Sequence, residues 1–421
     1  MNYKREVIGD NIGFSTIIDE KFNTCSLYVR FITELSEETA PANSVISALP
    51  AMSNSRFRTI GEMSDALSEL YGASLTSFSN RRGDAQIIGF SASWICSRFA
   101  LESEDITAEM LDIIHDCIFS PDIENGGFNN TNFKISQNNI IDSIESELND
   151  KRIYSVNQAY KLAFRGEPAG NSNCGTVEQA ESVTAESGLK SYMNLLETAQ
   201  VEIFYVAPEE NNKVSEMFRK GFAEINRNSR EYTIYSKSPL KTVPENITEE
   251  FDVNQSKMVI ALKSNSDDRF ASDMFSMILG GTPVSKLFAN VREKMSLCYY
   301  CSSNFYTEKN TIIIESGVDR ANIDKAYNEI IHQIDEIRNG NISDEEMQSA
   351  LLMLDNACSG IGDTPNQYFS WYFSRFCLGD SITPQEYLQK LSEVTKERII
   401  QVAESFSLDS SYYMLNKENA E

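Results

Sequence analysis

The chain has 421 residues, of which 41% are hydrophobic and 24% charged, with 20 glycines and 10 prolines. This composition is that of a folded globular protein with two or more domains, and it excludes a disordered or fibrous chain. The 37 basic residues are outnumbered by 62 acidic ones, so the formal net charge is −25 at pH 7. Such a charge repels nucleic acid and anionic membranes, and we expect neither as a partner, whereas a basic peptide suits it.

The amino-terminal run MNYKREVIGDNIGFSTII has no apolar core of signal-peptide length, and no run of about 18 apolar residues occurs. We therefore expect a cytoplasmic protein whose eight cysteines are reduced thiols. The one CxxC pair, Cys298 and Cys301, lies in an expected strand, where residues three apart point to opposite faces, so we interpret it as core packing. The two histidines, His115 and His332, lie beside apolar helical stripes and form no ligand motif.

The first half alternates helices and strands. Apolar residues recur at helical spacing over 60–70, preceded by the capping box of Thr59 and Glu62 and followed by Gly72. Two extended runs, 73–79 and 85–91, predict an antiparallel hairpin. Further patterns predict helices over 106–118, 133–148 and 189–196 and a buried strand over 201–207.

The second half repeats this order. It contains an expected strand over 258–262, helices over 270–279 and 284–291, a hairpin of 297–305 and 311–316, a helix over 323–337, and a helix that opens at Ser343. An offset of roughly 220 residues relates the halves, which indicates an internal duplication. We predict an α+β fold of two homologous domains, 1–225 and 250–421, each an antiparallel sheet covered by helices on one face and joined by the linker 226–249.

Two hydrogen-bond donors are placed to act together in the second half. Arg292 ends an expected helix and Tyr299 begins the following strand, so both side chains can reach a common point. Such donors can polarise a carbonyl or hold an extended peptide. Spacing alone leaves open a surface ion pair for Arg292 and a core position for Tyr299. Elsewhere, Asp142 and Glu145 could hold a hard cation or simply face water.

Several of these segments resemble the insulinase-like M16 metallopeptidases. The run GGTPVSKLFANVREKMSLCYYCSS is similar to the family's C-terminal signature, and YGASLTSFSNRRGD resembles the stretch that follows the family's zinc motif. The likeness spans nearly the whole chain. It implies two M16-type (LuxS/MPP-like) domains and one subunit of the M16B group, whose members work as two-subunit clamshells.

The chain departs from the family at the metal site. Active members carry the zinc motif H-x-x-E-H and a downstream glutamate ligand. Ser47 and Ala51 stand where the two histidines would be, Pro50 where the catalytic glutamate would be, and Ser143 near the third ligand. None of these side chains can replace an imidazole or a general base, so we expect no metal in this chain and zinc in a partner subunit.

Arg292 and Tyr299 match the family motif that a subunit without zinc supplies to the shared chamber. The resemblance therefore implies a non-catalytic subunit of a heterodimeric M16B peptidase, whose partners are a zinc-bearing paralogue and a peptide. Within the group, NDKRIYSVNQAYKLAFRGEPAG and REKMSLCYYCSSNF resemble the M16-like proteins associated with the 5-aminopentanol modification of elongation factor P, and related pairs occur in ribosomal-peptide maturation. Two alternatives remain: a peptide-binding scaffold without proteolytic role, and an independent enzyme with a carboxylate metal site.

Overall fold

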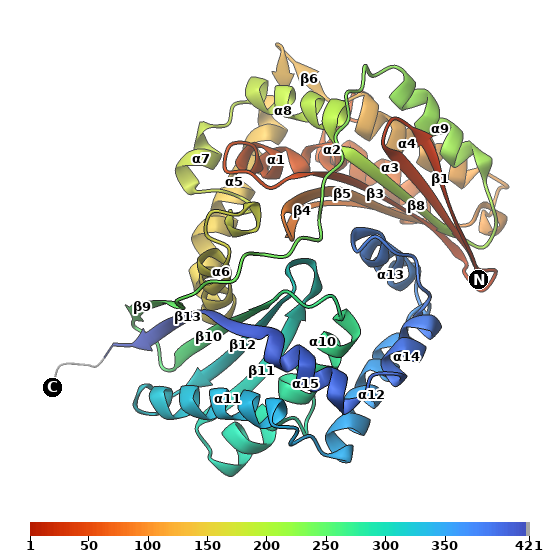
Figure 1. The fold of residues 1–421 in the computed structure, drawn as a ribbon. Coiled ribbons are helices and arrows are strands. Elements are labelled where there is room, and N and C mark those ends of the chain that lie inside the picture. The colour runs from red at the N-terminus through yellow and green to blue at the C-terminus, as the bar shows by residue number, and fades with distance from the viewer. Residues whose placement is uncertain (418–421) are drawn as a thin grey trace. The chain divides into compact units, whose positions relative to one another are not determined.

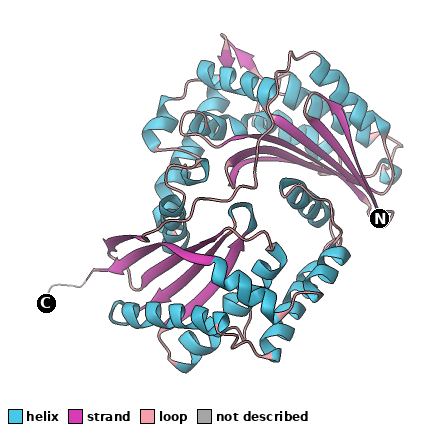
Figure 2. Cartoon of the chain, viewed as in Figure 1, coloured by secondary structure: helices cyan, strands magenta, loops and turns pink. Residues whose placement is uncertain are grey.

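The computed structural model describes residues 1–417, which form two compact units. Unit 1 consists of 1–146, 171–233 and 362–373, and unit 2, within the described residues, of 147–170, 234–361 and 374–417. Each unit is built around one sheet with helices packed on it (Figures 1 and 2). No helix within residues 1–417 combines the length and the apolar character needed to span a bilayer.

The sheet of unit 1 has six strands in the order β1-β2-β8-β3-β5-β4. The strands are β1 (Asn2–Gly9), β2 (Ile12–Ile18), β3 (Thr24–Glu34), β4 (Ser74–Arg82), β5 (Ala85–Ile95) and β8 (Gln200–Ala207). Only the β2–β8 pairing among them is parallel. The hairpin β4–β5 is the one expected from the sequence, although β4 runs closer to the turn than predicted and β5 extends further away from it.

The sheet of unit 2 has five strands in the order β11-β12-β10-β13-β9. These are β9 (Glu245–Phe251), β10 (Ser256–Ser264), β11 (Cys298–Tyr306), β12 (Thr311–Val318) and β13 (Phe406–Asn416). The β13–β9 pairing is parallel and the others are antiparallel. This order matches β4-β5-β3-β8-β2 of unit 1, including the position of the parallel pair. The α+β fold of two related sheets predicted from the sequence is therefore confirmed.

The helices of unit 1 begin and end at signals that the sequence carries. Thr59 and Glu62 form the expected capping box, and Gly72 takes a φ of +74° just after the helix that follows. The helices are α1 (Ala40–Ser47), α2 (Leu49–Met52), α3 (Ile60–Glu69), α4 (Ile106–Phe119), α5 (Asn130–Ser146), α7 (Val177–Ser182), α8 (Ala185–Thr198) and α9 (Asn212–Ala223). A small ribbon, β6 (Ile123–Glu124) with β7 (Gly127–Phe128), precedes α5.

The helices of unit 2 are α6 (Lys151–Ala163), α10 (Arg269–Ser276), α11 (Ile323–Arg338), α12 (Asp344–Ser359), α14 (Pro384–Ser392) and α15 (Lys396–Ser405). Two π-helical segments, Met277–Gly281 and Leu287–Lys294, replace the α-helical turns predicted there. π-helical turns are rare and recur at functional sites. A further helix, α13 (Pro365–Cys377), begins in unit 1 and ends in unit 2.

The 362–373 segment packs its aromatic side chains on the sheet of unit 1. Phe369 stacks on Tyr28 with ring centroids 4.1 Å apart, and Tyr372 stacks on Tyr3 at 4.0 Å. The guanidinium of Arg30 lies between the rings of Phe369 and Phe78, at 4.4 and 4.5 Å. Burial lowers the pKa of Arg30 to about 9. Aromatic and cation–π contacts therefore hold this segment on the sheet.

The 147–170 segment covers a face of the sheet of unit 2 in the same way. Tyr160 and Phe164 of this segment share a buried cluster with Val259, Ala261 and Met414 of the sheet. Arg152, at the start of α6, makes a two-pronged ion pair with Glu315 of β12, with both N···O distances at 2.7 Å. The first-half helix α6 is therefore part of the second unit's core.

The compact units thus differ from the continuous segments 1–225 and 250–421 expected from the sequence. An amphipathic helix pattern shows that a helix buries one face, but it does not show which sheet covers that face. The segment 226–249 also differs from a free tether. The backbone N–H of Ser236 donates to the Glu308 carbonyl, and the side chain of Ser238 is buried. The end of the segment is part of the sheet, because β9 begins at Glu245.

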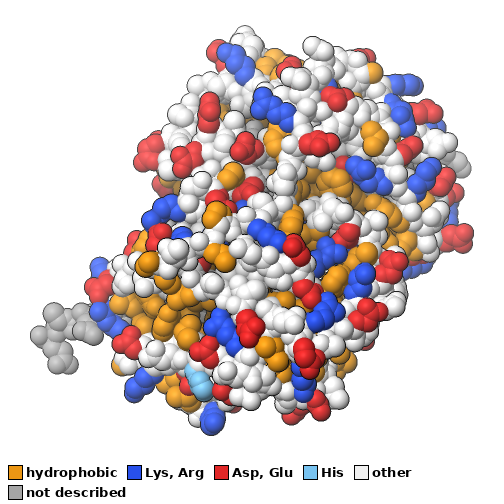
Figure 3. All heavy atoms as spheres, in the orientation of Figure 1, with side chains coloured by type: hydrophobic (Ala, Val, Ile, Leu, Met, Phe, Trp, Pro, Cys, Tyr) orange, Lys and Arg blue, Asp and Glu red, His pale blue; other side chains and the backbone are white. Residues whose placement is uncertain are grey.

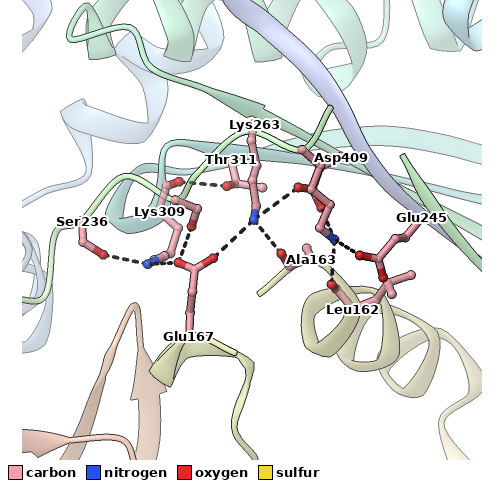
Figure 4. A network of polar contacts seen from close by, with 11 residues as sticks. Leu162, Ala163, Glu167, Ser236, Glu245, Lys263, Lys309, Thr311 and Asp409 are labelled. Carbon is pink, nitrogen blue, oxygen red and sulfur yellow. Dashed lines mark hydrogen bonds and ion pairs between the residues drawn. The ribbon is translucent and has the colours of Figure 1, made fainter. Parts of the chain in front are cut away.

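A network of charges fixes the end of α6 to the sheet of unit 2 (Figure 4). The ammonium of Lys263, whose side chain is 2% exposed, donates to the Ala163 carbonyl at 2.5 Å and lies 3.3 Å from Asp409. Glu167 accepts from Lys309 at 3.0 Å and lies 3.5 Å from Lys263. Because cations near the last carbonyls of a helix interact favourably with its dipole, the network stabilises the docked position of α6.

We predict that Lys263→Met destabilises the protein by about 3–5 kcal/mol, because it leaves the Asp409 carboxylate buried with fewer compensating charges. Urea unfolding of the full chain measures this change. Lys325→Met, at an exposed lysine of α11, is the matched control and should change the free energy of unfolding by less than about 0.5 kcal/mol. Equal losses in the two variants would contradict the role given to the network.

Asp273 of α10 is a second charged group packed within unit 2, and its side chain is half-buried. Its carboxylate accepts a hydrogen bond from the Tyr387 hydroxyl at 2.6 Å. Burial raises the pKa of Asp273 to about 6. The hydrogen bond from Tyr387 and the charges of Arg375 and Arg269 lower this pKa, but by less than burial raises it. The folded protein therefore binds this proton more tightly than the unfolded chain, whose aspartate titrates near 3.8.

It follows that Asp273 makes the folded state less stable as the pH rises from about 4 to about 6, with little further change above. We predict that Asp273→Asn gains stability relative to the unmodified chain over this window, by roughly 2–3 kcal/mol, since each pKa unit is worth about 1.4 kcal/mol. Denaturant unfolding of both proteins between pH 4 and pH 7 gives the difference directly. If the stability advantage of Asp273→Asn shrank as the pH rose, folding would lower the pKa of Asp273 instead of raising it, and the assignment would be contradicted.

Candidate functional site

The residues at the expected zinc positions lie at the junction of α1 and α2. Ser47 ends α1, is buried, and donates its hydroxyl to the Ser44 carbonyl at 2.8 Å. Pro50 and Ala51 belong to the one-turn helix α2, where Pro50 is buried. Each side chain is thus either bonded within its own helix or has no ligating atom, so the arrangement does not fit a zinc ion.

Ser143 lies on an exposed face of α5, the helix expected to carry the third ligand. Two turns earlier on the same helix, the hydroxyl of Ser136 donates to the Val45 carbonyl of α1 at 2.5 Å. This contact places Ser136, rather than Ser143, beside the helix of the degenerate motif. Both are serines, so the absence of a carboxylate ligand does not depend on which of them is matched.

A neutral polar network lies against α1. The amide of Gln86 donates to the Ala40 and Asn173 carbonyls at 3.1 and 3.0 Å, and it accepts from Asn43 at 3.0 Å. The Ser44 hydroxyl donates to the same Asn173 carbonyl at 2.7 Å. Sequence reasoning missed this network, although Asn43 and Ser44 interrupt the apolar pattern of α1 and could have indicated it. Amides and hydroxyls can bind a peptide or hold the helix, but they cannot activate water as a zinc site does.

Carboxylates do not assemble a metal site in the described part of the chain. Asp142 and Glu145 are both exposed on α5. Within residues 1–417, no group of three or more His, Cys, Asp and Glu side chains is placed to hold a metal ion. The two histidines are far from one another in sequence, on α4 and α11, and His115 contacts Asp116 and Phe119.

Arg292 lies at the end of the π-helical segment Leu287–Lys294. Its guanidinium stacks over the Phe288 ring at 4.6 Å and lies 3.5 Å from Glu293, and 42% of the side chain is exposed. The segment ends in a wide turn, in which Met295 donates to the Asn290 carbonyl five residues back. Arg292 therefore keeps most of its donors available to a ligand.

Tyr299 occupies a β-bulge at the start of the edge strand β11. Cys298 pairs with Val318 and Tyr300 with Gly317, so Tyr299 is the extra residue and has no partner position on β12. It is 64% exposed. Bulges are frequent beside functional sites, where they redirect a side chain. The phenol of Tyr299 is thus presented to solvent, and it is not the core aromatic that spacing alone left open.

The same bulge corrects the expectation for the CxxC pair. Cys298 and Cys301 were expected on opposite faces of a strand, but the extra residue shifts the alternation by one position. They pair with Val318 and Ser316, which share one face of β12, so both thiols lie on the same face of β11. The sequence held no signal for this, because a bulge is one added residue without a required residue type.

Comparison with known proteins shows which proteins this chain is similar to. Residues 182–354 match the family model described as peptidase M16 inactive domain. The "Probable inactive metalloprotease YmfF" of Bacillus subtilis (strain 168) is 24% identical over 427 residues, covering all of both chains. These matches include the Arg292 and Tyr299 region.

Solved structures share the fold over the full chain. A conserved protein from Enterococcus faecalis V583 superposes with a TM-score of 0.93 at 26% identity, and the peptidase M16 inactive domain from Pseudomonas fluorescens with a TM-score of 0.79 at 13% identity. Each comparison covers all of both chains. These findings show that the chain is similar, over its full length, to proteins described as inactive M16 peptidases.

Proposed function

We propose that this chain is the non-catalytic subunit of a heterodimeric M16B zinc peptidase. In this role Arg292 and Tyr299 bind substrate carbonyls near a zinc ion that belongs to a paralogous subunit carrying H-x-x-E-H. The observation that carries the proposal is the exposure of both donors on one helix–turn–strand unit in a chain whose zinc positions hold Ser47, Pro50 and Ala51. A chain that has the donors Arg292 and Tyr299 but no zinc ligands at the matched positions is suited to substrate binding and not to catalysis on its own.

The two sheets offer places for an extended peptide. Sheet 1 ends on β4 and sheet 2 ends on β11, and each edge strand has one side without a strand partner in its sheet. A peptide that adds as a further strand is held by main-chain hydrogen bonds, which accept many sequences. Binding that accepts many sequences suits a peptide-processing subunit. We include two processes in the proposal, ribosomal-peptide maturation and a pathway associated with the modification of elongation factor P.

A basic substrate is the finer part of the proposal. It rests on the net charge of −25, which favours approach of a cationic peptide. On the face drawn in Figure 3, acidic and basic side chains are interspersed, so the attraction there comes from the overall field more than from one acidic patch.

We predict that Arg292→Ala and Tyr299→Phe each lower turnover by the complex of this chain with its zinc-bearing paralogue by about 10²–10³-fold, because each removes one donor to a polarised carbonyl. Cleavage of a fluorogenic peptide by the mixed subunits measures the effect. Size-exclusion chromatography of the same mixtures should show unchanged assembly.

Two controls match these variants. Arg56→Ala removes an exposed arginine that also stacks on a neighbouring ring, Phe57 at 4.8 Å, and Tyr327→Phe removes a half-buried hydroxyl from α11. Both should leave turnover within about twofold of the unmodified complex. Equal turnover in the Arg292 and Tyr299 variants and their controls would refute the binding roles.

The alternative is a pseudo-peptidase that binds peptides or organises a complex without proteolysis. The neutral network of Gln86, Asn173 and Ser44 favours it, since a buried and satisfied polar cluster is a stable replacement for a lost metal site. The scaffold role predicts peptide binding without cleavage when the chain is mixed with its H-x-x-E-H paralogue, whereas the proposed subunit role predicts cleavage that neither chain shows alone.

Both roles predict a purified chain that contains no stoichiometric zinc, manganese or iron, because the described residues offer no ligand set. Elemental analysis of the isolated protein measures this. About one metal ion per chain would instead support an independent enzyme with a carboxylate metal site.

A further inference from the structure

Two thiols lie together beneath the bulge that carries Tyr299. Cys298 and Cys301 share one face of β11, as their partners on β12 show. That face is the one covered by α10, since Ser303, two residues beyond Cys301, donates to the Ser276 carbonyl of α10 at 2.6 Å. Both cysteines are largely buried, at 9% and 5% exposure, and the turn that precedes them, 293–296, is exposed.

The surroundings of the pair favour a thiolate at Cys298. A hydrogen bond from the Cys301 thiol lowers the pKa of Cys298, and the charge of Arg292 lowers it further, against the effect of burial. The hydrogen bond to Cys298 and burial raise the pKa of Cys301. Cys298, the member of the pair that the charge of Arg292 reaches, is therefore the thiol whose ionisation the surroundings favour.

We propose that Cys298 and Cys301 form a thiol–disulfide exchange site for an anionic low-molecular-weight disulfide of the glutathione class. Both cysteines lie on one face of an edge strand. The exposed guanidinium of Arg292 stands at the end of the preceding helix, and at this short range its positive charge outweighs the more distant, screened charges of the acidic chain, so it favours a disulfide that carries carboxylates. The exchange takes place on this chain alone and does not depend on the proposed function.

The reaction proceeds in two steps. The Cys298 thiolate attacks one sulfur of the disulfide, forming a mixed disulfide, and the first glutathione leaves as a thiolate that takes up a proton. Cys301 then gives up its proton and attacks the Cys298 sulfur, expelling the second glutathione. The two cysteines lose two electrons and the small disulfide gains them.

The chain contains a second close thiol pair that serves as an internal comparison. Cys25 and Cys96 have sulfurs 3.7 Å apart and line a cavity of about 480 Å³ in unit 1. Burial raises the pKa of Cys25 to about 12 and raises that of Cys96 as well. Since the thiolate is the attacking species, this pair should react much more slowly at neutral pH despite its short sulfur–sulfur distance.

The test treats the reduced full-length chain with oxidised glutathione at pH 7 and follows the products by intact mass and peptide mapping. The expected product has lost two hydrogen atoms and contains a Cys298–Cys301 disulfide that dithiothreitol reverses. In Cys301→Ser the second step is blocked, so one glutathione should remain on Cys298. Modification at Cys298 should be at least about tenfold faster than at Cys25, in line with the difference in thiolate fraction.

Two further arms test the role of charge and protect against misfolding. Cystamine, a cationic disulfide, should react more slowly than oxidised glutathione, and Arg292→Gln should narrow this difference. Circular dichroism and thermal melting confirm that each variant is folded. A disulfide that forms first between Cys25 and Cys96, the absence of glutathione on Cys298 in folded Cys301→Ser, or an equal rate with cystamine would overturn the proposal.

Discussion

The structure depends on covering both faces of each sheet. The central strands β8, β10 and β12 are buried at almost every position, so neither sheet can leave a face to water. The helices close in sequence cover one face, and a segment from the other half of the chain covers part of the second. In unit 2 that segment is 147–170, held by Lys263 and Glu315, and in unit 1 it is 362–373, held by Tyr28 and Arg30. Each compact unit is therefore incomplete without residues from the other half.

Much of this fold could be predicted because its signals are local. The capping box at Thr59, the hairpin of β11 and β12, and the shared order of elements all depend on residues near one another in sequence. The exchange of 147–170 and 362–373 could not be predicted, since periodicity shows that a helix has an apolar face and not which sheet will bury it. The π-helical turns before Arg292 were missed for a related reason, because their widening is set by packing and not by residue type.

The polar residues of α1, the helix matched to the zinc motif by resemblance, are satisfied by neutral partners. A buried polar group without a partner costs about 1–3 kcal/mol, so polar residues in a buried helix need hydrogen-bond partners. Here Asn43 and Ser44 of α1 are bonded to Gln86 and Asn173, and Ser47 bonds within its own helix. The region is satisfied without a charge, which removes any electrostatic pressure to bind a cation. The resemblance indicated which positions lack ligands, and the contacts show how the polar residues around them are satisfied.

The bulge at Tyr299 connects the two proposals, because one residue sets the direction of several side chains. The Tyr300 ring lies on the face of β11 that α6 covers, 4.7 Å from the guanidinium of Arg152. In a regular strand without the extra residue, Cys298 would lie on this same face and Tyr299 on the opposite face, which α10 covers. The extra residue reverses both directions: the phenol reaches solvent and the thiol lies beside Cys301. A bond between the two sulfurs would span the bulge and fix it. The exposure of the Tyr299 hydroxyl and the placement of Cys298 and Cys301 on one face are thus two consequences of the one extra residue in β11.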